Sequence, residues 1–360
     1  MNQKSLLALT LWLFLLLVLL NACEPEGGVA PPQKPISSGL FVLNQGNYMF
    51  SNASLSYYNP ETREVENKVF YRTNGFGLGD VAQSMTIYDS LAFIVINNSA
   101  RVDVMNVKTF RYVNTISGLV SPRHVLLISA EKGYISDLYA KSIFIFNPQT
   151  YEVTGTISLD KGSGEFYQHS TEQLLRFGDY VFTNCWSFDN KILLIDTRTD
   201  ALVDSIETGV QPVAMALDYQ QKLWVLTDGG YRGNPFGYEA PRLIRYDALS
   251  LEMEFSVSFG PDDKPTALAL NGSSDTLYLV NNHVWQMPVV ATAFPQQPFI
   301  DKGSRQFYAL GVDAYSSEVY VSDAVDYLQA GSIYCYNAQG QAIDTFKTGI
   351  VPGFFCFDRR

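Results

Sequence analysis

The chain has 360 residues, of which 47% are hydrophobic, 17% charged and 14% aromatic. This composition can bury a large core, which excludes a disordered, collagen-like or coiled-coil protein. The formal net charge of −11 leaves no basic surface for phosphate backbones or anionic lipid, so nucleic-acid binding is excluded too. The 22 Tyr and 23 Phe favour strands, and an all-β fold is predicted.

Residues 1–22 have the pattern of an export signal. Lys4 supplies a short positive region, and residues 6–20 form an apolar run shorter than the about 20 residues needed to span a membrane. The run ends in Leu20-Asn21-Ala22-Cys23, which resembles a lipobox. The resemblance implies cleavage before Cys23 and lipidation of that residue, with ordinary signal cleavage nearby as the alternative.

Residues 23–36 are predicted to form a flexible tether. They begin with the acidic tripeptide Glu24-Pro25-Glu26 and continue as a Gly/Pro-rich stretch, which is typical of an extended linker. The tripeptide resembles the signal that sends lipoproteins of the Bacteroidetes to the outer face of the outer membrane. The resemblance implies a lipid-anchored, cell-surface protein.

The other three cysteines are an odd number and have no C-x-x-C spacing, so neither a disulfide nor a cysteine zinc site is expected. They are Cys185, Cys335 and Cys356. Cys335 and Cys356 stand among aromatic residues in strand-like runs, which predicts buried core positions.

One turn motif recurs along the rest of the chain. It consists of Asn or Asp, two further residues and Thr or Ser, and it separates two alternating apolar runs. The Asx side chain can accept a backbone hydrogen bond from two residues further on, so each copy predicts a hairpin turn. The copies begin at Asn59, Asn106, Asn147, Asp196 and Asp247, with a degenerate one at Asn337.

These copies recur about every 45 residues, and each lies in a unit of four short strands, which is the pattern of a β-propeller blade. The last interval is twice as long, which indicates a weak copy near Met287, with 285–288 in place of the normal turn. A single seven-bladed propeller is therefore predicted over residues 37–360, with no helix required. The predicted blades are 38–70, 82–117, 122–159, 171–208, 212–259, 265–301 and 307–348.

The two ends of this domain are predicted to complete one blade. The first repeat starts with a second-strand motif, 39–43, that has no first strand before it. The C-terminal run 352–357 is a first strand with nothing after it. Pairing of Phe354–Phe357 with Leu40–Leu43 would therefore close the ring.

The repeat cadence resembles that of the YncE-like, surface-layer-type seven-bladed propellers. Its strand pairs are clearest from Pro212 and from Pro265 to Val280, and Asp196 to Thr199 shows the turn. With the lipobox, the chain is also similar to Bacteroidetes surface propeller lipoproteins of the BtuG type. That resemblance implies capture of a corrinoid, or of a ferric siderophore, above a TonB-dependent outer-membrane transporter.

A binding site is expected on the face where the second-to-third-strand loops and the inter-blade loops emerge. These loops combine aromatic, amide and arginine side chains, which suit a flat, bulky, polar ligand. Trp186, Tyr231, Arg232 and Trp285 are the predicted anchors. The full set of expected contacts is Tyr48, Arg72, Phe76, Arg123, His124, Tyr139, Tyr167, His169, Trp186, Tyr231, Arg232, His283, Trp285, Arg305 and Tyr327.

The sequence indicates less about the chemistry of this site than about its position in the fold. The three histidines, His124, His169 and His283, lie in these loops, but their spacing does not show that they converge, so no metal and no cofactor are predicted. G-x-S-x-G, H-E-x-x-H and phosphate-loop motifs are missing, so no catalytic residue is assigned.

Three functions therefore remain open. The favoured hypothesis is a non-enzymatic capture protein for a bulky nutrient, which passes its ligand to the transporter. The second is a lyase- or lactonase-type propeller enzyme with a loop histidine as general base and a metal polarising the substrate. The third is a protein-interaction scaffold.

Overall fold

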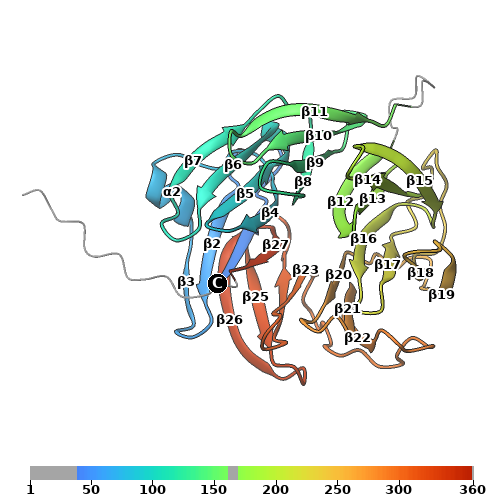
Figure 1. Cartoon of the computed structure of the whole chain (residues 1–360). Helices are drawn as coiled ribbons and strands as arrows, with labels where there is room; N and C mark the ends of the chain where they lie inside the picture. The colour runs from blue at the N-terminus through green and yellow to red at the C-terminus, as the bar shows by residue number, and fades with distance from the viewer. Residues whose placement is uncertain (1–38, 161–168, 359–360) are drawn as a thin grey trace, which may run out of the picture. The chain divides into compact units, whose positions relative to one another are not determined.

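The computed structural model describes residues 39–160 and 169–358. Its strands form seven antiparallel sheets that radiate from one axis as the blades of a propeller (Figure 1). The predicted all-β, seven-bladed fold is confirmed. The predicted signal peptide, the tether with Cys23, and Tyr167 lie outside the described residues.

Blades 1 to 4 each contain four strands. Blade 1 consists of β27 (Pro352–Phe357), β1 (Leu40–Asn44), β2 (Ser54–Asn59) and β3 (Glu64–Glu66). Blade 2 consists of β4 (Ala82–Tyr88), β5 (Leu91–Ile96), β6 (Arg101–Asn106) and β7 (Tyr112–Ile116). Blade 3 consists of β8 (Pro122–Leu127), β9 (Gly133–Asp137), β10 (Ser142–Asn147) and β11 (Glu152–Ser158). Blade 4 consists of β12 (Ser170–Phe177), β13 (Tyr180–Ser187), β14 (Lys191–Asp196) and β15 (Ala201–Glu207).

Blades 5 and 7 repeat this pattern, whereas the sheet of blade 6 has three strands. Blade 5 consists of β16 (Pro212–Leu217), β17 (Lys222–Thr227), β18 (Arg242–Asp247) and β19 (Met253–Ser258). Blade 6 consists of β20 (Ala267–Leu270), β21 (Thr276–Asn281) and β22 (His283–Pro288). Blade 7 consists of β23 (Phe307–Val312), β24 (Val319–Asp323), β25 (Ala330–Tyr336) and β26 (Ala342–Ile350).

Blade 6 departs from the sequence prediction. The prediction of a turn at 285–288 was wrong, because these residues lie inside β22 and pair with β21. In place of a fourth strand, a single bridge joins Val284 to Ile300 through two backbone hydrogen bonds of 3.0 Å. The outer edge of this blade is therefore covered by irregular chain.

Helical structure is nearly absent from residues 39–160 and 169–358, as predicted for the propeller. The exceptions are α2 (Val69–Asn74), which connects blades 1 and 2, and the 3-10 turn η1 (Asn97–Ser99). Val69 and Phe70 bury one side of α2. No helix in residues 39–160 and 169–358 has the length and apolar character needed to cross a membrane.

The predicted Asx turns form as expected. Asn59 Oδ1 accepts hydrogen bonds from the N–H groups of Glu61 and Thr62, at 2.9 and 3.2 Å. Arg63 then adopts a left-handed conformation with φ 58°, which turns the chain into the outer strand. The same bond from two residues on recurs at Asn106, Asn147, Asp196, Asp247 and Asn337.

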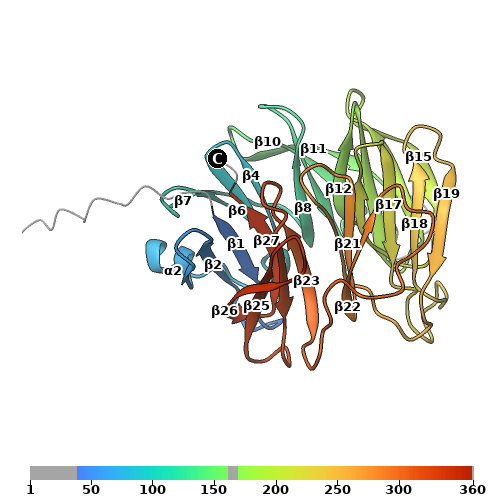
Figure 2. The ribbon, with the colours of Figure 1, turned by 90° about the horizontal axis from the view of Figure 1, so that it is seen from below.

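The ring closes where it was predicted to close. Strand β27 pairs antiparallel with β1 (Figure 2). Leu40 lies opposite Phe357, and Leu43 lies opposite Phe354. The innermost strands β27, β4, β8, β12, β16, β20 and β23 then contact one another in a closed circle. The last strand of the chain is therefore also part of the wall around the axis.

The core is divided among the joints between blades. Blades 2 and 3 enclose Phe93 and Phe146, and blades 5 and 6 enclose the fully buried Trp224. Blades 7 and 1 enclose Cys335, whose predicted burial is confirmed, whereas Cys356 is only half-buried. Further apolar clusters join blades 3 and 4, blades 4 and 5, and blades 6 and 7.

Deleting residues 352–360 should abolish cooperative folding of the domain. The deletion removes the inner strand of blade 1 and exposes the edge of β1, which normally pairs with it. Thermal melting followed by far-ultraviolet circular dichroism measures the effect. An unchanged melting transition would show that closure through β27 is dispensable.

Candidate functional site

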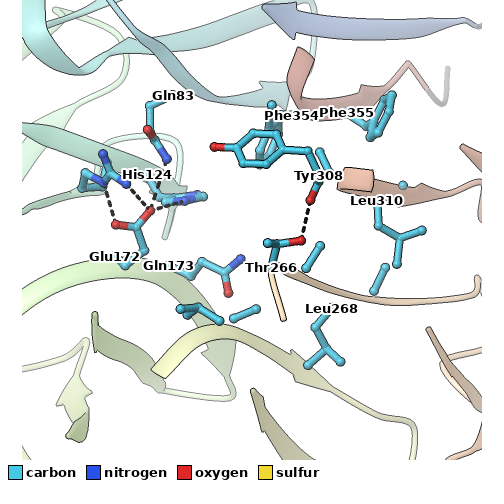
Figure 3. Close-up of a pocket in the computed structure, with 18 of the residues that line it drawn as sticks. Gln83, His124, Glu172, Gln173, Thr266, Leu268, Tyr308, Leu310, Phe354 and Phe355 are labelled. Atoms are coloured by element: carbon cyan, nitrogen blue, oxygen red, sulfur yellow. Dashed lines mark hydrogen bonds and ion pairs between the residues drawn. The ribbon is translucent and has the colours of Figure 1, made fainter. Parts of the chain in front are cut away.

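The propeller axis contains a cavity of about 700 Å³. All seven blades contribute to its wall, mostly through their innermost strands, and Figure 3 shows part of that wall. Strands β8 and β12 begin at one face of the ring, next to the ends of β9 and β13. The cavity is within the size range of small-molecule sites, about 300–1,000 Å³.

One side of the wall carries a buried ion pair between blades 3 and 4. Arg123, the second residue of β8, donates from Nε and Nη2 to the two carboxylate oxygens of Glu172 in β12, at 2.6 and 2.9 Å. The side chains are 12% and 8% exposed. This bidentate geometry is the strongest form of Arg–carboxylate contact.

Two further side chains converge on the same carboxylate, as Figure 3 shows. His124 Nε2 lies 3.5 Å from Oε1 of Glu172, and Gln83 of β4 donates to that oxygen at 3.3 Å. Burial raises the pKa of Glu172, but the charge of Arg123 and the contact with His124 outweigh it and hold the pKa at about 2. Glu172 is therefore ionised at neutral pH.

Trp186 and Asp228 extend this polar wall toward blade 5. The Arg123 guanidinium lies 5.6 Å from the centroid of the Trp186 ring, within cation–π range. Burial raises the pKa of Asp228, whereas the Gly230 N–H, the charge of Lys264 and a hydrogen bond with Trp186 act to lower it. A register shift between Ser170 and Thr171 of β12 lies opposite Trp186. Such bulges commonly re-aim a side chain.

The opposite side of the wall is neutral. The Tyr308 hydroxyl donates to Gln45 Oε1 at 3.2 Å. The backbone carbonyl of Tyr308 accepts a hydrogen bond from the Thr266 hydroxyl at 2.7 Å (Figure 3). Burial raises the pKa of the Tyr308 phenol, so it remains protonated. Apolar side chains continue the wall along β20, β23 and β27: Ala267, Leu268, Ala269, Leu270, Leu310, Val312, Phe354, Phe355 and Phe357.

The structure brings three of the predicted site residues together at this cavity: Arg123, His124 and Trp186. The histidines do not meet in the part of the chain that the structure describes. His169 is 4% exposed and its Nδ1 lies 2.9 Å from Asp189 Oδ2. His283 accepts a hydrogen bond from the Lys302 N–H at 3.2 Å and lies beside Trp285.

Two of the remaining predicted residues belong to local packing rather than to the cavity wall. The Trp285 indole donates to the Asn281 carbonyl at 3.0 Å and contacts Phe294. Arg305 donates to the backbone of Asp301 and Lys302 and to the Tyr336 hydroxyl.

The other predicted residues within the described chain are exposed and lie outside the cavity wall. Arg72 is exposed on α2, 3.4 Å from Glu66, and Phe76 follows that helix. The loop residues among them are Tyr48, Tyr139, Tyr231, Arg232 and Tyr327.

Sequence reasoning missed Glu172, Gln83 and Gln173 as wall residues. Their signal is polar character near the start of an inner strand, where other blades carry Val213 or Phe354. The loops are rich in aromatic residues, but the cavity wall is built mostly by the innermost strands.

The fold and the cavity define the class of protein as a seven-bladed β-propeller with a ligand-sized central cavity. A family model described as a domain of unknown function, DUF5074, matches residues 38–351. The chain belongs to this family. No match was found among curated proteins.

Solved structures share the fold at low sequence identity. A quinonprotein alcohol dehydrogenase-like protein from Bacteroides thetaiotaomicron superimposes with a TM-score of 0.69 at 13% identity, covering 91% of this chain and 79% of that one. The periplasmic gluconolactonase of Pseudomonas aeruginosa gives 0.66 at 11%, covering 89% and 99%. A putative 6-phosphogluconolactonase from Bacteroides fragilis gives 0.62 at 14%, covering 90% and 99%.

Replacing Glu172 by Gln should destabilise the domain by about 3–5 kcal/mol, because Arg123 is left buried without its counter-charge. The pKa of Glu172 is about 2 in the folded protein against an ordinary value of 4.5. The stabilisation that ionised Glu172 contributes is therefore complete above the pKa of the unfolded state, 4.5, and it is lost as the pH falls toward the folded-state pKa of about 2. In urea unfolding, the difference in free energy of unfolding between the parent protein and Glu172→Gln should narrow below about pH 4.5.

Glu131→Gln is the control, because Glu131 is exposed in a turn. It should unfold like the parent protein at every pH. If Glu172→Gln and the parent protein differed little in free energy of unfolding at pH 7, a stabilising role for the ion pair would be contradicted.

Proposed function

We propose that this protein is a non-enzymatic, surface-tethered capture protein that holds a bulky nutrient at the cavity mouth and passes it to a TonB-dependent outer-membrane transporter. A corrinoid is the first candidate ligand and a ferric siderophore the second. The observation that carries the proposal is the central cavity, whose wall joins a polar side at Arg123, Glu172 and Trp186 to an apolar side along β20, β23 and β27.

The polar wall favours binding over proton transfer. A general acid or base works best with a pKa near the operating pH, and Arg123 holds the pKa of Glu172 far below that range. Gln45, Gln83, Thr266 and Tyr308 add neutral amide and hydroxyl groups. Such groups orient a polar ligand without requiring it to carry a particular charge.

Exposed rings extend the surface beyond the cavity. Tyr48 is 66% exposed and Tyr231 50%, and both follow second strands that end at the face where the inner strands begin. Tyr139 and Tyr327 occupy corresponding loops of blades 3 and 7. A ligand larger than the cavity would place one group inside and rest its remaining area on these rings.

Truncating Trp186 to Ala should weaken ligand binding by about 30-fold, equivalent to about 2 kcal/mol, because a central aromatic anchor carries a large share of the affinity. Tryptophan fluorescence titration with cyanocobalamin, and separately with a ferric catecholate siderophore, measures the change. The matched control is Trp285→Ala, whose indole packs against Phe294 and not on the cavity wall. It should lose stability and retain affinity. If neither probe bound the parent protein, both ligand classes would be rejected.

A lactonase-type enzyme is the second candidate, because His124 lies beside an ionised carboxylate in the cavity. The gluconolactonase of Pseudomonas aeruginosa shares the fold, which supports testing lactone hydrolysis. Glucono-δ-lactone turnover that His124→Ala abolishes without loss of binding would favour the enzyme over the capture protein.

Replacing Cys23 by Ser should release the protein from membranes and leave the propeller folded, because the proposed lipid anchor requires the Cys23 thiol. Fractionation of cells into soluble and membrane pools, followed by melting of the purified domain, tests both parts. Retention of the variant in the membrane pool would remove the anchor from the proposal.

A further inference from the structure

A second cluster of reactive side chains lies in blade 4. His169, Cys185 and Asp189 each present a ligand atom, and these atoms lie within 4.8 Å of one another. They form the one group of three or more such residues within residues 39–160 and 169–358. The proposed ligand-capture function does not involve this cluster.

The cluster is buried among apolar residues. His169 is 4% exposed, Asp189 7% and Cys185 0%, and Cys185 belongs to the hydrophobic cluster between blades 3 and 4. Burying ionisable groups together is costly unless they are paired or bind a metal. The 2.9 Å contact between His169 Nδ1 and Asp189 Oδ2 joins two of the three groups, and the thiol lies next to them.

The backbone holds the three residues in place. Cys185 lies in β13 opposite Thr171 of β12, and His169 directly precedes β12. Asp189 Oδ1 accepts the Asn190 N–H at 2.7 Å, and the Asp189 carbonyl accepts the Gln211 N–H at 2.9 Å. The ligand atoms are therefore presented by paired strands and a braced loop.

We propose that His169, Cys185 and Asp189 bind one zinc ion. A thiolate, an imidazole and a carboxylate are the ligands that zinc uses, whereas calcium and magnesium require oxygen ligands. On binding, the Cys185 thiol gives its proton to solvent and its sulfur bonds to the metal, while neutral His169 supplies a nitrogen lone pair.

Side-chain rotations that close the spread of up to 4.8 Å between the three ligand atoms would bring them to zinc-binding distances. Zinc–nitrogen and zinc–oxygen bonds of about 2.0–2.1 Å separate such ligand atoms by roughly 3.3 Å in a tetrahedron. The observed separation of 2.9 Å between Nδ1 and Oδ2 is slightly shorter, and small side-chain rotations would widen it. Three protein ligands leave the fourth position for water.

Metal analysis of the untagged full chain tests this site. After treatment with a chelator and exposure to zinc chloride, elemental analysis should find about one zinc per chain. Replacing zinc by Co²⁺ should produce a sulfur-to-cobalt charge-transfer band in the near ultraviolet, because a thiolate is a ligand. Zinc should also raise the melting temperature of the chelator-treated protein.

The variants are Cys185→Ala and Asp189→Asn, with Cys335→Ala as the matched control for loss of a buried cysteine in another blade. Cys185→Ala should lose the cobalt band and most of the bound zinc, and Cys335→Ala should keep both. The cobalt spectrum of the unmodified chain decides the question even if Cys185→Ala fails to fold. Failure of the unmodified chain to bind zinc, or an unchanged cobalt band in Cys185→Ala, would overturn the proposal without affecting the central cavity.

Discussion

The pairing of β27 with β1 is the constraint on which the remaining structure depends. A sheet blade has two edges and two faces, and only a closed ring gives every blade a neighbour on both faces. Here the closing strand is also an inner strand, so it supplies Gly353 and Phe354 to the cavity wall. Gly311 of β23 belongs to the same joint, because a Cβ there would lie 2.8 Å from that of Phe355. Closure, packing and cavity are therefore consequences of one strand pairing.

The cavity wall is asymmetric because the inner strands differ in side-chain size and polarity. Arg123 and Glu172 fill the space between blades 3 and 4 with an ion pair, whereas blade 6 presents small residues such as Ala267 and Ala269. Burying a charge pair requires that its hydrogen-bonding capacity be met, and Gln83 and His124 do this for the carboxylate. The asymmetry of the wall gives a ligand one polar and one apolar side.

The two neighbouring residues Cys185 and Trp186 show how one strand can serve two sites. Alternation along β13 places Cys185 in the apolar cluster between blades 3 and 4, and Trp186 at the central cavity. The metal site proposed at Cys185 and the ligand site proposed at Trp186 can therefore be separated by mutation.

Family membership and likeness of fold do not identify the ligand, because propellers of one shape carry unrelated functions.

The sequence by itself determined the all-β class, the seven blades, the Asx turns and the closing strand, because these follow from local periodicity and turn chemistry. Blade 6 escaped this logic at 285–288, where tertiary pairing with β21 replaced a turn. Only the tertiary structure decided which polar residues meet. Arg123 and Glu172 are 49 residues apart in the chain, and His169 and Asp189 are 20 apart. The Arg123–Glu172 contact depends on how two neighbouring blades pack, and the His169–Asp189 contact depends on how the loop after β13 folds back on the start of β12, so the local sequence pattern determines neither.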